Sequence, residues 1–215
     1  MANLNQPYGL SPQFLRNGSP YNGMGRMYMI AATDTNAFYV GDVVSMANTS
    51  DTTDQWCVPI VTLTTAGAGN PIRGVIAAVG GPAPQGGFQP GGPYINPTNL
   101  QSNYRPAASQ TSAWMVLVHD DPNIVFSIQE NLNGGTFGPQ SSIASKNASF
   151  VYAAPATGVF VSGTMLDANT YAAGATYQLK LLGPVMDGVN TPLASYQRLL
   201  VTINNHDFNA GTTGI

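Results

Sequence analysis

The chain has 215 residues and a formal net charge of −3 at pH 7, and only 8% of its residues are charged. An ordinary soluble domain carries about 25% charged residues, so solubility here must depend on Asn, Ser, Thr and Gln side chains. Seven Lys and Arg residues are too few for extensive contact with a nucleic-acid backbone, and no apolar run approaches the roughly 20 residues of a membrane-spanning helix.

Hydrophobic residues make up 43% of the chain, which is enough to bury one core, and all-β chains of this length commonly form a single domain. Thr, Val, Tyr, Asn and Gly favour strands and turns, whereas the Glu, Lys and Arg residues that cover helix surfaces are scarce. With one cysteine, Cys57, no intrachain disulfide is available. The opening ten residues lack the charged and apolar regions of a secretory signal, so we expect synthesis in the cytoplasm.

Residues 1–25 are predicted to form an extended N-terminal arm. Proline and glycine recur through this stretch among Asn, Gln and Ser, a pattern that breaks both helices and strand ladders. A free linker has little use for large apolar side chains, yet the arm contains Tyr8, Leu10, Phe14 and Tyr21. We therefore expect the arm to lie along its own domain or along a neighbouring subunit.

From residue 26 onward, short β-rich runs alternate with turn signals, and residues 26–208 are predicted to form a single β domain. A short helix over 193–200 is the only helical candidate, although this stretch can equally lead straight into a strand. Strands without crossover helices predict an all-β fold, which is a β-sandwich, jelly roll or barrel. Residues 209–215 are expected to be a flexible tail. The predicted strands are 26–32, 37–47, 58–64, 72–79, 114–119, 124–129, 159–165, 176–182 and 198–204.

A long loop is predicted over residues 80–105, which are dense in Gly and Pro. Structureless loops of this length in compact domains are usually functional or disordered. Phe88, Tyr94 and Tyr104 are spaced through it, and aromatic side chains on a Pro-rich segment can anchor into a neighbour at a modest entropic cost. Two interpretations stay open: a partner-binding loop, or one whose aromatic side chains fold back on their own sheet.

Few residues in the sequence are candidates for metal binding or catalysis. His119 and Asp121 can share one face of a strand end, and a metal site there would need further ligands such as His206 and Asp207. The stretch from Asp120 to Pro122 between two apolar runs is also a common turn composition, and we favour that interpretation. The glycine-containing stretch 66–71 predicts a hairpin turn and not a phosphate-binding loop.

No catalytic constellation is recognisable. No Gly-x-Ser-x-Gly motif occurs, Cys57 lies in no nucleophile context, and Glu130 is the single glutamate. We therefore expect a protein that is not an enzyme and that needs no cofactor or metal.

Seven stretches in this order resemble small structural proteins encoded with the head genes of tailed bacteriophages. The resemblance spans most of the chain, but the insertion over 80–103 has no counterpart in it. The stretches are NQPYGLSP (5–12), NGSPYNG (17–23), VGDVV (40–44), IRGVI (72–76), YRPA (104–107), DDPNIVFSIQE (120–130) and RLLVTINNH (198–206).

This resemblance implies a capsid decoration (cement) protein that sits on the outer surface of the virion and holds subunits of the major capsid protein together, often as a homotrimer at threefold positions. It implies assembly in the host cytoplasm. The low content of Lys and Arg and the lack of a long apolar run predict no nucleic-acid or membrane partner. We expect six side chains to anchor partner contacts, unless all of them pack within one subunit. They are Tyr8, Leu10, Phe14 and Tyr21 of the arm, and Phe88 and Tyr94 of the loop.

Two other classes of function are considered. A carbohydrate- or receptor-binding β-sandwich would stack exposed Tyr and Trp side chains on sugars, but Trp114 lies inside an apolar run and is expected in the core. A lyase or hydrolase on a β scaffold would require His119 or an aspartate for turnover.

Overall fold

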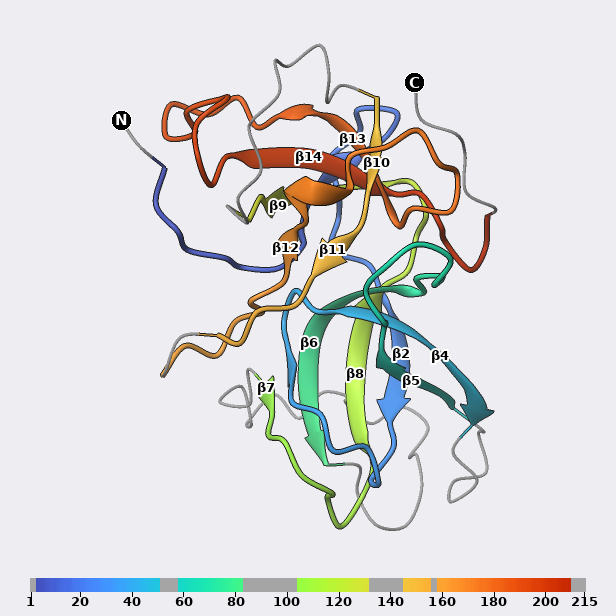
Figure 1. Cartoon of the computed structure of the whole chain (residues 1–215). Coiled ribbons are helices and arrows are strands. Elements are labelled where there is room, and N and C mark those ends of the chain that lie inside the picture. Colours follow the sequence, from blue (N-terminus) through green and yellow to red (C-terminus); the bar gives the residue numbers. More distant parts are fainter. Residues whose placement is uncertain (1–2, 51–57, 83–103, 132–144, 156–157, 210–215) are drawn as a thin grey trace.

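The computed structural model describes residues 3–50, 58–82, 104–131, 145–155 and 158–209. Strands dominate this part of the chain, and its one helical element is the short 3-10 helix η1 (Ala168–Thr170). A closed barrel and a five-stranded sheet lie one above the other (Figure 1). The predicted all-β class is confirmed.

The barrel forms the lower half of Figure 1. Its strands follow the order β2 (Arg26–Ile30), β5 (Pro59–Leu63), β4 (Val43–Ser50), β6 (Gly74–Pro82) and β8 (Trp114–His119), and β2 closes the ring by pairing with β8. Only the β2–β5 pair is parallel. Alternate side chains of β8, which are Trp114, Val116 and Val118, point into the barrel core, as the period of two along a strand requires.

The second sheet forms the upper half. All of its pairs are antiparallel, in the order β1 (Ser11–Leu15), β9 (Ile124–Gln129), β14 (Arg198–Ile203), β13 (Leu179–Pro184) and β10 (Asn147–Ala148). Two small ladders complete the fold. They pair β11 (Phe150–Val151) with β12 (Met165–Leu166), and β3 (Phe38–Tyr39) with β7 (Tyr104–Arg105).

Strands β4 and β6 belong to both halves of the molecule. Val43 and Val75 are buried in the core beneath the five-stranded sheet, whereas their neighbours Val44 and Ile76 are buried in the barrel core. Successive side chains of a strand point to opposite faces, so these two strands are apolar on both faces. The shared strands join the two cores into one folded unit.

The buried side chain of Arg105 fixes the conformation of residues 31–36, which precede β3, through hydrogen bonds. Its side chain is 0% exposed and donates hydrogen bonds to the carbonyl oxygens of Asn36 (2.7 Å), Asp34 (2.5 Å) and Ala31 (3.3 Å). The guanidinium carbon also lies 5.6 Å from the centroid of the Phe38 ring. A buried cation needs such compensation, because desolvation without hydrogen bonds is costly.

Several predicted strands agree with the structure and others do not. The ranges 114–119 and 124–129 match β8 and β9. The range 37–47 is split into β3 and β4, because Gly41 adopts a positive φ of 93° in the turn between them. Of 159–165, only the last residue enters a strand, β12.

Two interpretations were open for 193–200, a short helix or a direct lead into a strand, and the structure has the second. Leu193 and Tyr196 have positive φ angles of 63° and 59°, so the chain turns here and then enters β14. The hairpin predicted at 66–71 was wrong, since β5 and β6 flank β4 and do not pair with each other.

The arm was expected to break strand ladders, but β1 within it pairs with β9. Pro12 is tolerated because β1 lies at the edge of the sheet and its register shifts at a bulge between Pro12 and Phe14. Of the predicted loop 80–105, residues 80–82 extend β6 and residues 104–105 form β7, and the rest lies outside the described residues.

Two leucines of the arm provide a test of this packing. Leu10 is 2% exposed in the core beneath the sheet, whereas Leu4 is 71% exposed. Replacing Leu10 with alanine should lower the free energy of unfolding by about 2–5 kcal/mol, because the substitution leaves a cavity. The matched Leu4→Ala variant should change it by less than about 0.5 kcal/mol. Urea unfolding measures both values, and an equal small effect would contradict the placement of the arm.

Candidate functional site

The N-terminal arm starts against the β13–β14 hairpin. The Asn3 side-chain amide donates hydrogen bonds to the carbonyl oxygens of Thr191 (2.9 Å) and Ser195 (3.1 Å), and its oxygen accepts one from the Thr191 backbone amide (2.8 Å). Buried Gln129 of β9 donates to the Leu4 carbonyl oxygen at 2.6 Å. These bonds fix the first described residues of the arm on the sheet.

Further along, the arm meets two other segments at a point of close backbone approach. Gly9 has a φ of 73°, and a Cβ atom there would lie 2.4 Å from the Gly41 carbonyl oxygen and 2.6 Å from the Ser162 Cβ atom. The Leu10 backbone amide donates to that Gly41 oxygen at 3.0 Å. Only glycine fits at position 9, because any side chain would push the arm away.

A buried carboxylate holds the same junction together. Asp42 is 3% exposed and accepts hydrogen bonds from the Ser162 hydroxyl (2.5 Å), the Tyr39 backbone amide (2.8 Å) and the Thr164 hydroxyl (3.4 Å). Burial raises the pKa of Asp42 to about 6, while these hydrogen bonds act in the opposite direction. The group ties the turn between β3 and β4 to the chain at residues 162–164.

The chain between β11 and β12 projects from the molecule as a loop (Figure 1, left). At its base the Ala153 backbone amide donates to the Gly163 carbonyl oxygen (3.3 Å). Val159, Phe160 and Val161 are three consecutive exposed apolar side chains on this loop. The Phe160 ring, 44% exposed, stacks on Tyr104 with its centroid 4.5 Å away, so the loop carries a fixed apolar surface.

The β13–β14 hairpin presents a second group of exposed apolar side chains. Met186 is 84% exposed, and Val189 and Leu193 are also exposed. An ion pair between Arg198 and Asp187 at 2.7 Å holds the hairpin. Its apolar side chains therefore project from an ordered turn.

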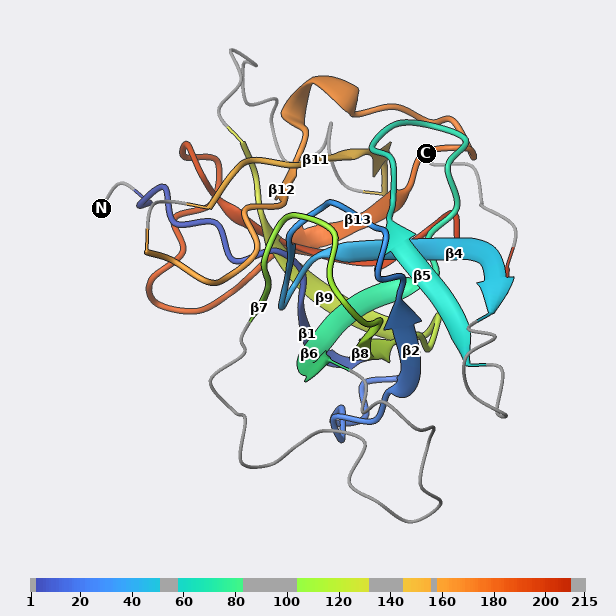
Figure 2. The ribbon, with the colours of Figure 1, turned by 90° about the horizontal axis from the view of Figure 1, so that it is seen from below.

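The β13–β14 connection and the chain that leads into β12 both lie toward the left in Figure 1 and in the view from below in Figure 2. The arm connects the two groups, because it contacts the hairpin at Asn3 and the base of the projecting loop at Gly9. Exposed large apolar side chains on such projecting segments are typical of interaction surfaces. We call this surface the apolar strip and define it by Leu4, Val159, Phe160, Val161, Met186, Val189 and Leu193.

The four predicted contact residues of the arm are not part of the strip. Leu10 lies in the chain's own core, which corresponds to the alternative in which it packs within one subunit. Tyr8, Phe14 and Tyr21 are half-buried on the same subunit, and the Tyr8 hydroxyl donates to Ser127 Oγ at 3.1 Å. Phe88 and Tyr94 lie outside the described residues.

Sequence reasoning missed the strip. Its clearest signal was the run of Val159, Phe160 and Val161, which has the composition of a buried strand. Met186 and Val189 stand in a turn-rich stretch, where isolated apolar residues carry little information.

His119 and Asp121 have separate structural roles. His119 Nδ1 lies 2.6 Å from the Tyr21 hydroxyl, which also donates to the Met24 carbonyl oxygen, and the two rings meet edge to face at 5.1 Å. Asp121 accepts hydrogen bonds from the backbone amide (2.8 Å) and side chain (3.0 Å) of Asn123, which confirms the predicted turn. Burial lowers the pKa of His119, which favours the neutral ring.

The remaining predicted candidates are also engaged in packing. Asp207 forms an ion pair with Arg73 at 3.2 Å, and the ring of neighbouring His206 stacks on Phe208. Glu130 is buried and accepts a hydrogen bond from Gln197 at 2.6 Å, and burial raises its pKa. Within the described ranges, no three His, Cys, Asp or Glu side chains come close enough to hold a metal ion.

Comparisons of this chain with models of protein families, with curated proteins and with solved structures each found no match. A search of the described residues for a helix that is long and apolar enough to cross a membrane found none.

The buried Asp42 carboxyl predicts a pH-dependent contribution to stability. Its pKa is 3.8 in a model peptide and about 6 when folded, so the native state holds a proton between these values that the unfolded chain releases. The free energy of unfolding contributed by Asp42 should therefore fall by about 2 kcal/mol as the pH rises from about 4 to about 7.

The measurement is the difference in free energy of unfolding between the wild-type protein and Asp42→Asn, taken by urea titration across this pH range. Groups common to both proteins cancel in this difference. An Asp187→Asn control should show no such fall, because hydrogen bonding to the Asn190 backbone amide and the charge of Arg198 lower the pKa of Asp187. A flat difference for Asp42→Asn would show that the carboxyl titrates normally.

Proposed function

We propose that this chain is a capsid decoration protein that binds the outer surface of a tailed-phage head and stabilises contacts between subunits of the major capsid protein. The observation that carries the proposal is the apolar strip on a chain with only 8% charged residues. The resemblance of seven sequence stretches to head-gene structural proteins supplies the class of partner.

The strip has the chemistry of a protein–protein contact. Apolar area removed from water contributes about 25 cal/mol per Å², and a stable interface buries more than about 1,000 Å² in total. Met186 and Val189 extend from the β13–β14 hairpin and Phe160 from the loop between β11 and β12, so a partner that engages all three spans both segments. Charged groups are sparse here, and Arg198 and Asp187 neutralise each other, so little polar desolvation opposes association.

The way in which the arm is held reduces the cost of binding. Flexible segments lose conformational entropy when they dock, and each immobilised side chain raises the free energy of binding by about 0.5–1.5 kcal/mol. The hydrogen bonds of Asn3 and Gln129, and the junction around Gly9, order the strip before a partner arrives. A cement protein needs such a rigid surface because it must resist the outward pressure of a packaged genome.

The outer face of the shell suits the charge of the chain. A net charge of −3 with seven Lys and Arg residues gives no attraction to a packaged nucleic acid. A homotrimer at threefold positions, as the resemblance implies, would present three copies of the strip to the surrounding capsid subunits.

Co-sedimentation of the purified protein with undecorated phage heads tests the proposal. The wild-type protein should pellet saturably, and raising the salt concentration should change its affinity little, because apolar contacts are hardly screened. The double variant Phe160→Ser, Met186→Ser should bind at least about tenfold more weakly, since truncating a central apolar contact costs more than about 1 kcal/mol.

The matched control is Met24→Ser, Leu182→Ser, which removes two exposed apolar side chains outside the strip. It should bind as the wild type does. Circular dichroism verifies that each variant is folded. If folded wild-type protein stays in the supernatant, the decoration role is wrong; equal binding by both variants would place the contact elsewhere.

A further inference from the structure

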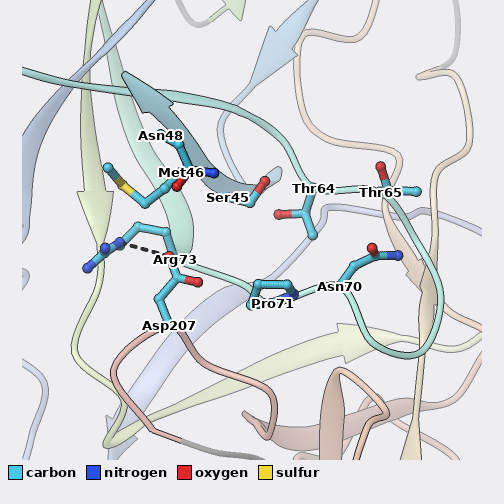
Figure 3. A pocket seen from close by; sticks show the side chains of 9 residues that line it. All are labelled: Ser45, Met46, Asn48, Thr64, Thr65, Asn70, Pro71, Arg73 and Asp207. Atoms are coloured by element: carbon cyan, nitrogen blue, oxygen red, sulfur yellow. Dashed lines mark ion pairs between the residues drawn. The ribbon is translucent and has the colours of Figure 1, made fainter. Parts of the chain in front are cut away.

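A polar pocket of ≈ 380 Å³ lies where the barrel meets the segment after β14 (Figure 3). This volume falls within the range of about 300–1,000 Å³ that is typical of small-molecule sites. Five uncharged polar side chains contribute to its lining, and they are Ser45, Asn48, Thr64, Thr65 and Asn70.

The wall formed by residues 64–71 is held in place by Gln178, which is fully buried. Its side-chain oxygen accepts a hydrogen bond from the Gly67 backbone amide (2.9 Å), and its nitrogen donates to the carbonyl oxygens of Thr65 (2.9 Å) and Asn70 (3.2 Å). One interior side chain thus fixes three points of the wall. A pocket with a rigid wall binds without a large ordering cost.

Asn48 reaches the pocket from a bulge in β4. The pairing of β4 with β5 shifts register between Met46 and Ser50, and Asn48 within this shift has a positive φ of 57°. Bulges re-aim side chains and are over-represented next to functional sites. Asn adopts the left-handed conformation more readily than most other non-glycine residues, which suits it to this bulge.

The opposite side of the pocket in Figure 3 is formed by Arg73 and Asp207. Their ion pair has an Nε–Oδ2 distance of 3.2 Å, and both side chains are mostly buried. Asp207 is positioned by backbone pairing, because the Ile72 amide donates to the Asn205 carbonyl (2.8 Å) and the Asp207 amide donates to the Ile72 carbonyl (2.9 Å). The paired charges cancel, so the pocket has no net preference for an anion or a cation.

Thr64 has an unused hydrogen-bonding group at the pocket. Its side chain is 1% exposed, and its hydroxyl has no hydrogen-bond partner among the residues that the structure describes. In Figure 3 this hydroxyl and that of Ser45 point toward the same space. A buried hydroxyl without a partner costs free energy, and a ligand hydroxyl in the pocket can remove that cost.

We propose that this pocket binds a neutral polyhydroxylated ligand, with a single sugar ring as the fitting size class. Hydroxyl and amide side chains on one side, with an Arg–Asp pair on the other, supply both donors and acceptors for ligand hydroxyls. Met46 and Pro71 add an apolar surface for the C–H face of the ring. Strand β4, which supplies Ser45, Met46 and Asn48 to the pocket, lies on the right in Figures 1 and 2, whereas the β13–β14 connection lies on the left. A protein partner docked on that connection therefore leaves the pocket open.

Titration of the purified full chain with glucose, galactose, mannose and N-acetylglucosamine, followed by NMR chemical-shift changes, tests the proposal. At least one sugar should bind saturably in the millimolar range or tighter. The Thr64→Val and Ser45→Ala variants should each weaken binding about fivefold, the typical effect of one lost hydrogen bond of about 1 kcal/mol. Thr35→Val on the exposed turn before β3 is the matched control and should bind as the wild type does.

Thr64→Val has a second readout, because removing a buried hydroxyl without a partner should leave the Tm unchanged or raise it. Binding that is lost in the two pocket variants and kept in Thr35→Val supports the site. No saturable shift with any of the four sugars overturns it, as does binding that both pocket variants retain. Competition by sulfate would overturn the preference for a neutral ligand. None of these readouts uses phage heads, so failure here is distinct from failure of the proposed decoration role.

Discussion

The close contact between Gly9, Gly41 and Ser162 is the constraint on which the functional surface depends. It joins three segments that are far apart in sequence: the arm, the turn between β3 and β4, and the base of the projecting loop. Their backbones approach so closely that a Cβ atom at position 9 would overlap its neighbours. Asp42 then ties the turn to Ser162 through a short hydrogen bond. Desolvating this carboxylate costs stability at pH 7, and in return the loop and the arm keep a fixed relation.

A second constraint comes from the strands that both halves of the molecule share. Val43 and Val44, like Val75 and Ile76, send neighbouring side chains into different cores. Loss of one core would therefore expose one face of β4 and β6 to water, so the barrel and the sheet stabilise each other. Both surfaces that we assign to binding lie at connections around this framework. Rigid strands position them, and the connections vary in shape without disturbing the cores.

The sequence predicted the elements whose pattern is local. Strands β8 and β9 were found because two apolar runs flank the Asp121 turn, and the all-β class followed from composition. Strand β1 was missed because Pro12 argues against a ladder, and only the topology reveals that β1 is an edge strand. The run from Val159 to Val161 was assigned to a strand because exposure depends on tertiary contacts that composition cannot encode. The pocket was missed for the same reason, since Arg73 and Asp207 meet only through backbone pairing around Ile72.

Low charge gives the two proposed binding surfaces a common physical basis. Charged surfaces steer partners over long distances and respond to salt, whereas uncharged surfaces select by shape, apolar area and directional hydrogen bonds. The apolar strip would select a partner by shape and apolar area, and the pocket around Thr64 would select a ligand by directional hydrogen bonds. Without electrostatic steering the association rate constant of such surfaces is low. Contacts made by segments that are already ordered before binding have a low dissociation rate constant. In the proposed decoration role, slow dissociation matters more than fast capture, and the ordered arm, the anchored loop and the low surface charge would all favour it.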